Sequence, residues 1–511
     1  MFKGEFIMRR LLRAIAPLAI FISAPAAADW REHETAHFLI VSESPPAEVE
    51  EFAGRLESYD KLMRMATGTK IDDPVKVRIY EVPSLSEVEQ ALGEHNSGIA
   101  GFYDSNILGP YAVTPHRTRG TGRYFTPELV LHHEYAHHFM LQYFPAIYPS
   151  WYVEGFAELI GSSEMIDDNT IGYGMPAKHR GHDIAANWVP LDELLTRERV
   201  VYLDTYAQGW ALTHFLTFDK QRSGQLRQYL AELGRGKPMA DAAKAFGDLA
   251  ELNREARRYV TSGTFEYRPV KVNIQRPAIQ NARTLSAGEA ALIPQTIAFR
   301  DDDLLFIRKD GDRRREERLR RNNLEGIRGK ARRFPTDPYA LMLLGEAEYA
   351  SGNYSEAGAA ADRLLAIDSS NVRGLSRKSL VLSQLAAKRS GPERTATIAE
   401  ARMLAARANR LDVDQAIPLL AYYQSFNLVG EKVPEIATNG LIQAVSMLPR
   451  DDSARQLLVD QMAREQRFDE AIGWLMMIAN APHESPRRTA AREQMETLKA
   501  ARTAAKSASA P

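Results

Sequence analysis

The sequence predicts an α+β part followed by an all-α part built from stacked helix pairs. Strand-like and helix-like segments alternate from Trp30 to about residue 114. A helical pattern with a capped start follows and contains Leu-His-His-Glu-Tyr-Ala-His-His at residues 131–138. Residues 344–357 then read as a helix pair with a glycine in the turn. A chain of 511 residues is too long for one ordinary core, which agrees with two or three domains.

Strand signals occur at residues 37–41 and 75–80, and residues 46–67 form an amphipathic helical pattern between them. Residues 99–114 read as two short strands around the turn at Gly109-Pro110. This pair is either an ordinary structural hairpin or a sheet edge that binds an extended peptide as a further strand.

The next helix carries a candidate metal site. Thr126 is a good N-cap and Pro127 suits the first helical position, so we expect a helix from Pro127 to about Gln142. His133 and His137 are four residues apart and therefore lie on one face, where both imidazoles can bind one zinc ion. Glu134 lies between them and can take a proton from a metal-bound water.

A second segment supplies a third ligand. Glu154 follows His137 after 16 intervening residues, and a second helix packed on the first would complete a His, His, Glu site with one open position. Glu158, one turn later, can hydrogen-bond the far nitrogen of a ligand histidine. We expect His132 and His138 to be packing or supporting groups.

At these residues the chain resembles the gluzincin metallopeptidases, a group that includes thermolysin and the aminopeptidase N family. Trp151, Glu154 and the run Gly155-Phe156-Ala157 match the W-L-N-E-G-F-A pattern, with Val153 in place of asparagine. Tyr206-Ala207-Gln208-Gly209 is similar to the Y-x-K-G segment, with Gln208 in place of lysine. The resemblance implies a zincin-like metallopeptidase domain in which Glu154 is a zinc ligand and Tyr206 stabilises an oxyanion.

His214 and His182 are weaker alternatives to Tyr206. The G-x-M-E-N segment of the aminopeptidase N family does not occur before His133, so an endopeptidase is favoured over an aminopeptidase. The closer resemblance is to secreted bacterial proteins grouped as peptidase MA-like, which combine a short zincin domain with helical repeats.

The C-terminal part resembles the tetratricopeptide repeats. The segment from Leu344 to Ala357 fits their consensus, and weaker echoes follow to residue 484. Stacked helix pairs of this kind form a superhelix whose concave face can bind a protein partner. We therefore expect the zincin-like domain at residues 29–264, a linker or small bridging strand pair at 265–310, the repeats at 311–502 and a disordered tail at 503–511.

Composition and the N-terminus indicate the compartment. Basic residues near Arg9 precede an apolar stretch and the A-x-A pattern before Asp29, so residues 1–28 read as a signal peptide. The apolar stretch is shorter than the roughly 20 residues of a membrane span, and we expect no stable membrane insertion. The chain lacks cysteine, and its net charge of −1 gives no reason to expect nucleic acid. The periplasm is the expected location.

These observations predict a secreted zinc-dependent metallopeptidase that acts on a peptide or protein substrate, with repeats that recruit substrate or partner. Two alternatives remain. One is a periplasmic adaptor or assembly protein in which the α+β part is an inactive scaffold. The other is a zinc hydrolase acting on a non-peptide amide.

Overall fold

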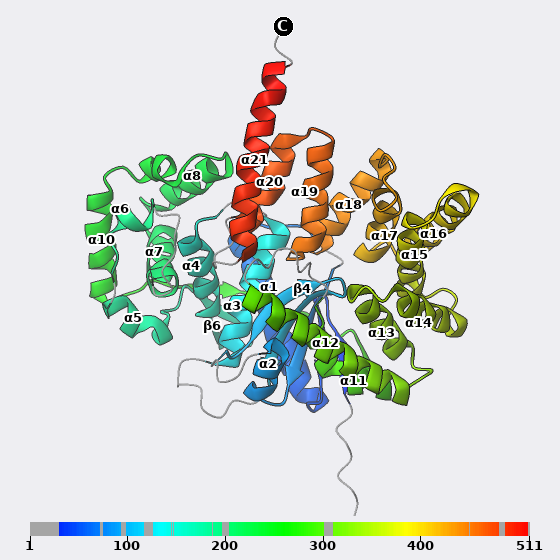
Figure 1. Cartoon of the computed structure of the whole chain (residues 1–511). Helices are drawn as coiled ribbons and strands as arrows, with labels where there is room; N and C mark the ends of the chain where they lie inside the picture. Colours follow the sequence, from blue (N-terminus) through cyan, green and yellow to red (C-terminus); the bar gives the residue numbers. More distant parts are fainter. Residues whose placement is uncertain are drawn as a thin grey trace, which may run out of the picture.

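The computed structural model describes residues 30–71, 75–93, 99–116, 126–144, 146, 148–186, 188–196, 204–300, 310–448, 450–479 and 486–508. They form a sheet-containing part, residues 30–300, and a helical part, residues 310–508 (Figure 1). The expected signal peptide, residues 1–28, lies outside the described residues. Among the described residues, no helix is both long and apolar enough to cross a membrane.

The main sheet has six strands in the order β4-β5-β3-β2-β1-β9. Strand β3 is parallel to β2 and to β5, and the other neighbours are antiparallel. The strands are β1 (Arg31–Glu34), β2 (Phe38–Ser42), β3 (Val77–Val82), β4 (Phe102–Asn106), β5 (Gly109–Pro115) and β9 (Asn281–Thr284). The free edge beside the candidate metal helix is therefore β4, the first strand of the expected hairpin.

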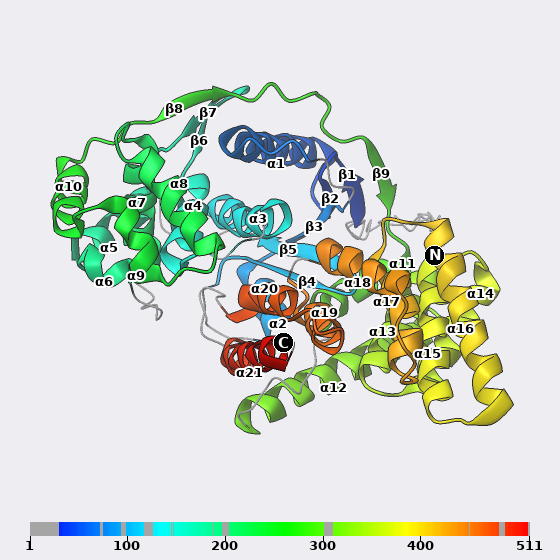
Figure 2. The same ribbon diagram turned by 90° about the horizontal axis from the view of Figure 1, so that it is seen from above.

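Helices cover both faces of this sheet, because apolar side chains alternate along its strands. Ile40 and Ile79 face the core that contains α1 (Pro46–Thr67) and α3 (Pro127–Tyr143). Val41 and Tyr80 face the opposite core, against α2 (Leu85–Leu92) and α11 (Ala287–Ile297). Figure 2 shows α1 and α3 on one side of the strands and α2 and α11 on the other.

A helical lobe follows α3. It begins with α4 (Ser150–Gly161) and contains a small sheet of order β6-β7-β8. Its remaining elements are β6 (Glu164–Asp167), β7 (Thr170–Tyr173), η1 (Lys178–Arg180), α5 (Gly181–Ala186), α6 (Leu191–Leu194), η2 (Asp204–Gln208), α7 (Gly209–Phe218), α8 (Ser223–Gly234), α9 (Met239–Ala242), η3 (Ala243–Phe246) and α10 (Leu249–Ser262). The described part of residues 187–261 is mainly helical.

The segment expected as a linker has more structure than its sequence indicates. Strand β8 (Arg268–Lys271) pairs with β7, and β9 pairs with β1. The chain thus crosses over α1 and joins the two sheets (Figure 2). The two strands do not pair with each other, because each finds its partner roughly 100 or more residues earlier in the chain.

The helical part consists of successive antiparallel helices. They are α12 (Asp310–Arg333), α13 (Pro338–Ala350), α14 (Tyr354–Ile367), α15 (Val372–Ala387), α16 (Gly391–Leu411), α17 (Ala416–Asn427), α18 (Glu435–Met447), α19 (Asp452–Arg464), α20 (Phe468–Ala479) and α21 (Pro486–Ala508). The predicted helix pair is α13 and α14, and Gly352 in its turn has a φ of 78°, which favours glycine. Helix α21 extends to Ala508, so most of the expected disordered tail is helical.

Candidate metal centre

The candidate site lies where α3, α4 and α7 pack closely. A Cβ atom at Gly161 of α4 would lie 3.2 Å from the carbonyl oxygen of Leu129 in α3. A Cβ at Gly155 would overlap the backbone of Gly209 in α7, and a Cβ at Gly209 would overlap the carbonyl oxygen of Trp151. Small residues at these crossings bring the three helices together, and Glu154, next to Gly155, is fixed at the closest approach.

The three predicted ligands converge there. The two Nε2 atoms of His133 and His137 are 3.1 Å apart. An Oε2 atom of Glu154 lies 3.2 Å from Nε2 of His133 and 3.5 Å from Nε2 of His137. Tetrahedral zinc with bonds of about 2.0–2.1 Å requires ligand atoms about 3.3 Å apart, so this triangle fits a zinc ion. It is one of two such groups among the described residues.

Electrostatics favour a cation in this triangle. Burial lowers the pKa of His133, but Glu154, Glu158 and Glu134 outweigh that effect and raise this pKa to about 9. Burial raises the pKa of Glu154, but the two histidines outweigh it and lower this pKa well below its usual range. Buried ligand atoms in a negative environment can bind either a proton or a metal ion.

Glu158 supports His133, as the sequence predicts. One carboxylate oxygen lies 3.4 Å from Nδ1 of His133, and the other accepts a hydrogen bond from His179 at 2.7 Å. Arg180 also binds Glu158, at 2.7 Å. Burial raises the pKa of Glu158, but these basic groups outweigh burial and lower this pKa to about 2. His179 and Arg180 were not predicted, because no spacing pattern connects η1 to the metal helix.

Tyr206 lies beside the ligands. It belongs to η2, a π-helical turn directly before α7, and its ring stacks on His133 with centroids 5.7 Å apart. The Arg180 guanidinium lies 4.7 Å from the Tyr206 ring centre. The two alternatives to Tyr206 lie elsewhere. His214 is buried between Gly174 and Tyr259, and the side chain of His182 is 94% exposed.

Glu134 is partly exposed on α3, and its charge acts on His133. The neighbouring His132 stacks on Tyr59, and burial lowers the pKa of His132 to about 3. His138 bonds the hydroxyl of Tyr103 in β4 at 2.7 Å, and burial lowers its pKa to about 3 as well. Both of these flanking histidines are therefore neutral packing groups.

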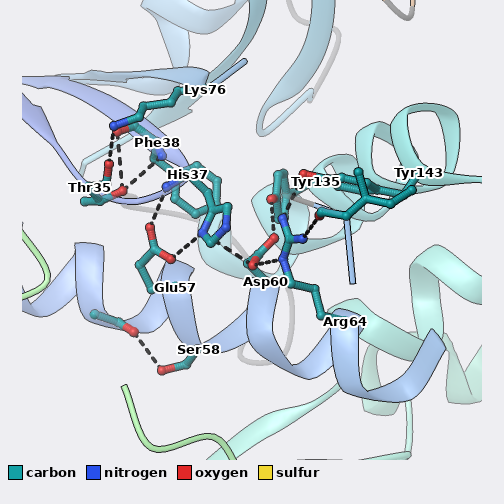
Figure 3. Close-up of polar contacts among 12 residues, drawn as sticks. Thr35, His37, Phe38, Glu57, Ser58, Asp60, Arg64, Lys76, Tyr135 and Tyr143 are labelled. Atoms are coloured by element: carbon teal, nitrogen blue, oxygen red, sulfur yellow. Dashed lines mark hydrogen bonds and ion pairs between the residues drawn. The ribbon is translucent and has the colours of Figure 1, made fainter. Parts of the chain in front are cut away.

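The second group with metal-ligand geometry is an ion-pair network (Figure 3). Nδ1 of His37 is 2.7 Å from Glu57 and 3.4 Å from Asp60. Arg64 forms an ion pair with Asp60 at 2.6 Å, and the hydroxyl of Tyr135 in α3 donates a hydrogen bond to Asp60 at 2.8 Å. Because Arg64 already neutralises Asp60, this group ties α1 to the back of the metal helix rather than offering a free ligand set.

One unforeseen residue of the helical part contacts the hairpin beside α3. Arg450, in the turn between α18 and α19, donates a hydrogen bond to the carbonyl of Tyr103 at 2.9 Å. A second contact lies further along the hairpin, where Arg373 of α15 donates to the carbonyl of Ile107 at 2.9 Å. The helical part therefore holds the hairpin that packs beside α3, a long-range arrangement that no sequence pattern indicates.

Comparison with known proteins returns no matching family model and no matching curated protein. Two solved structures are similar in part. A thermophilic TPR protein from Thermus thermophilus, TTC0263, is 22% identical and covers 35% of this chain and 90% of its own, with a TM-score of 0.30. Yeast Tom70 is 11% identical and covers 72% of this chain and 69% of its own, with a TM-score of 0.25.

These findings correct the family prediction. The first of these structures is named as a TPR protein, and neither is named as a peptidase. Membership of the gluzincin metallopeptidases, including the peptidase MA-like group, is therefore wrong, and the prediction of a zinc metallopeptidase enzyme is wrong with it. The prediction of an α+β part followed by helical repeats holds at the level of architecture, but the sheet-containing part is not shown to be a zincin domain. The expected peptide substrate has no support, whereas a protein partner agrees with the helical repeats.

Proposed function

We propose that this chain is a zinc-binding adaptor, in which the α+β part holds the ion and the helical repeats bind a protein partner. The observation that carries the zinc site is the ligand triangle of His133, His137 and Glu154, with edges of 3.1, 3.2 and 3.5 Å. A bound ion would be a Lewis acid with one position open for an oxygen ligand.

Residues around the triangle fit this role. Glu158 orients His133, and its own clamp by His179 and Arg180 keeps it ionised. Tyr206 stacks on His133, and Glu134 lies on α3 between the two histidines, so both could bond an oxygen ligand of a bound ion. The periplasm is the proposed location, because residues 1–28 read as a signal peptide.

The repeats support the adaptor part of the proposal. Stacked helix pairs present extended surfaces, and proteins of this architecture use them for binding. The inner side of these repeats also holds the chain's own β4–β5 hairpin, through Arg373 and Arg450. A partner that binds the repeats would therefore contact the structure that supports the metal helix.

Zinc affinity tests the first half of the proposal. Purified protein is titrated in competition with a chromogenic chelator, and the bound metal is identified by elemental mass spectrometry. We expect one zinc ion per chain, and a loss of about 100-fold or more in affinity for His137→Ala and Glu154→Gln. Unchanged affinity in both variants would contradict the site.

A peptide-library assay tests whether the chain is an adaptor rather than a peptidase. Zinc-loaded protein and its Glu134→Gln variant are incubated with a mixed peptide library, and the products are read by mass spectrometry. An adaptor gives no products in either sample. Zinc-dependent products made only by the unmutated protein would refute the proposal.

A further inference from the structure

A cavity of about 310 Å³ lies in the helical lobe, between η1, α5, α7 and α10. Its apolar wall is formed mainly by Ile184, Trp188, Trp210, Val260 and Phe265. The rings of Trp210 and Phe265 meet edge to face, with centroids 5.0 Å apart. Ligand pockets in proteins usually measure about 300–1,000 Å³, so this cavity suits a molecule with a single ring rather than a peptide.

The charged side chains that line this cavity are both cations, Lys178 and Arg257. Among the described residues, no carboxylate lines it. Lys178 forms an ion pair with Glu164 at 2.8 Å, so its charge is already balanced. Arg257 is exposed on α10 and forms no ion pair within the described part of the chain. The cavity therefore has one positive charge without a partner, which favours a ligand with one negative charge.

Trp210 supplies a second donor without an acceptor. Its side chain is 1% exposed, and its indole N–H forms no hydrogen bond with the residues that the structure describes. Trp188 differs, because its indole N–H donates to the side-chain oxygen of Asn253 at 2.9 Å. A buried indole N–H usually has a partner, and the absence of one at a cavity wall indicates an acceptor on a ligand.

We propose that this cavity binds a small monocarboxylate that carries one aromatic ring. The ring would lie against Trp188, Trp210 and Phe265, because aromatic side chains favour edge-to-face and offset contacts with another ring. The carboxylate supplies both the negative charge and the acceptor atoms that this wall lacks. Arginine binds such a group through two parallel hydrogen bonds, which assigns the carboxylate to Arg257.

This binding site goes beyond the proposed zinc-binding adaptor. None of the three predicted zinc ligands lines the cavity, so occupancy by an aromatic carboxylate does not require a bound ion. A chain that fails to bind zinc can still bind the carboxylate, and the two proposals therefore fail separately.

The test is calorimetric titration of the purified full chain with three probes. Phenylacetate has the ring and the charge, phenylacetamide has the ring alone, and acetate has the charge alone. We expect a Kd of about 1 mM or lower for phenylacetate and an affinity about 10-fold or more weaker for each of the other two probes. Equal affinities for phenylacetate and either partial probe, or no binding of phenylacetate at about 10 mM, would overturn the proposal.

Variants of α10 locate the bound probe. Arg257→Met should lower the affinity for phenylacetate by about 10-fold or more and leave that for phenylacetamide unchanged. The matched control is Arg258→Met, which removes the adjacent exposed arginine that does not line the cavity and should change neither affinity.

Val260→Phe tests the apolar wall, because a larger side chain there occupies part of the cavity. It should weaken the binding of phenylacetate and phenylacetamide alike, with circular dichroism used to establish that the variant is folded. Unchanged phenylacetate affinity in Arg257→Met, or in folded Val260→Phe, would show that the probe binds elsewhere and would refute this site.

Discussion

Substitution of Gly209 by alanine should separate α4 from α7 and weaken the metal site. The added Cβ would overlap the carbonyl oxygen of Trp151 and would lie 3.3 Å from the backbone nitrogen of Gly155. Both obstacles are backbone atoms, so no side-chain rotation relieves them and the helices must move apart. Overpacking of this kind costs about 1–3 kcal/mol, and we expect the upper end of that range.

The assay is urea denaturation followed by circular dichroism, together with zinc affinity by chelator competition. Because Glu154 precedes Gly155 at this crossing, the same displacement should lower zinc affinity by about 10-fold or more.

The matched control is Gly473→Ala in α20, where a Cβ meets nothing within 4 Å. That change should stabilise the protein by roughly 0.5–1 kcal/mol and leave zinc binding unchanged. A Gly209→Ala variant with an unaltered unfolding midpoint and unaltered zinc affinity would refute the packing argument.

Three further predictions follow from the described contacts. Removal of zinc by a chelator, compared with protein at a free zinc concentration 100 times the Kd, should lower the free energy of unfolding of the unmutated protein by about 2.7 kcal/mol. The same treatment should leave the stability of His137→Ala unchanged. Glu158→Gln should lower zinc affinity by about 10- to 100-fold. An affinity equal to that of the unmutated protein would show that the contact between Glu158 and His133 does not support zinc binding. Burial lowers the pKa of His37, but the carboxylates of Glu57 and Asp60 outweigh burial and raise this pKa above 6.5. Burial raises the pKa of Glu57, but the hydrogen bond and charge of His37 outweigh burial and lower this pKa below 4.5. The pair therefore stabilises the fold most between these two ordinary values, and its contribution is lost as the pH rises through the folded pKa of His37 or falls through that of Glu57. His37→Gln should then destabilise the protein more at about pH 5.5 than at about pH 8.5, measured by denaturation at both values, and a pH-independent effect would contradict this assignment.

Local signals made part of this structure predictable. Helix α1 occupies residues 46–67 as its periodicity indicates, and α3 begins where Thr126 caps it, with its hydroxyl accepting from the Leu129 amide at 3.1 Å. The third ligand, Glu154, followed from residue type and spacing on a second helix. Such features depend on neighbours within a few turns of the chain, which one sequence displays directly.

Features that depend on distant segments were not predictable. The partners of β8 and β9 lie in strands formed roughly 100 to 250 residues earlier, and short polar strands such as β9 carry no pattern that selects a partner. His179 and Arg180 of η1 reach Glu158 beside the candidate metal site, and Arg450 of the helical part reaches strand β4. Each is an ordinary basic residue in the sequence, and only the packing of α3 against those elements gives it a role.

The same packing explains why matching motifs led to a wrong family. Gly155 and Gly209 match the peptidase patterns, yet both are required simply because α4 and α7 touch at these positions. His133, His137 and Glu154 match as well, but their geometry fits a cation without determining what such an ion would bind. A reaction would depend on the ligand that reaches such an ion, which the three side chains do not determine. For this chain, the motifs therefore indicate a candidate cation site, and residue matching alone does not reveal what that site binds or does.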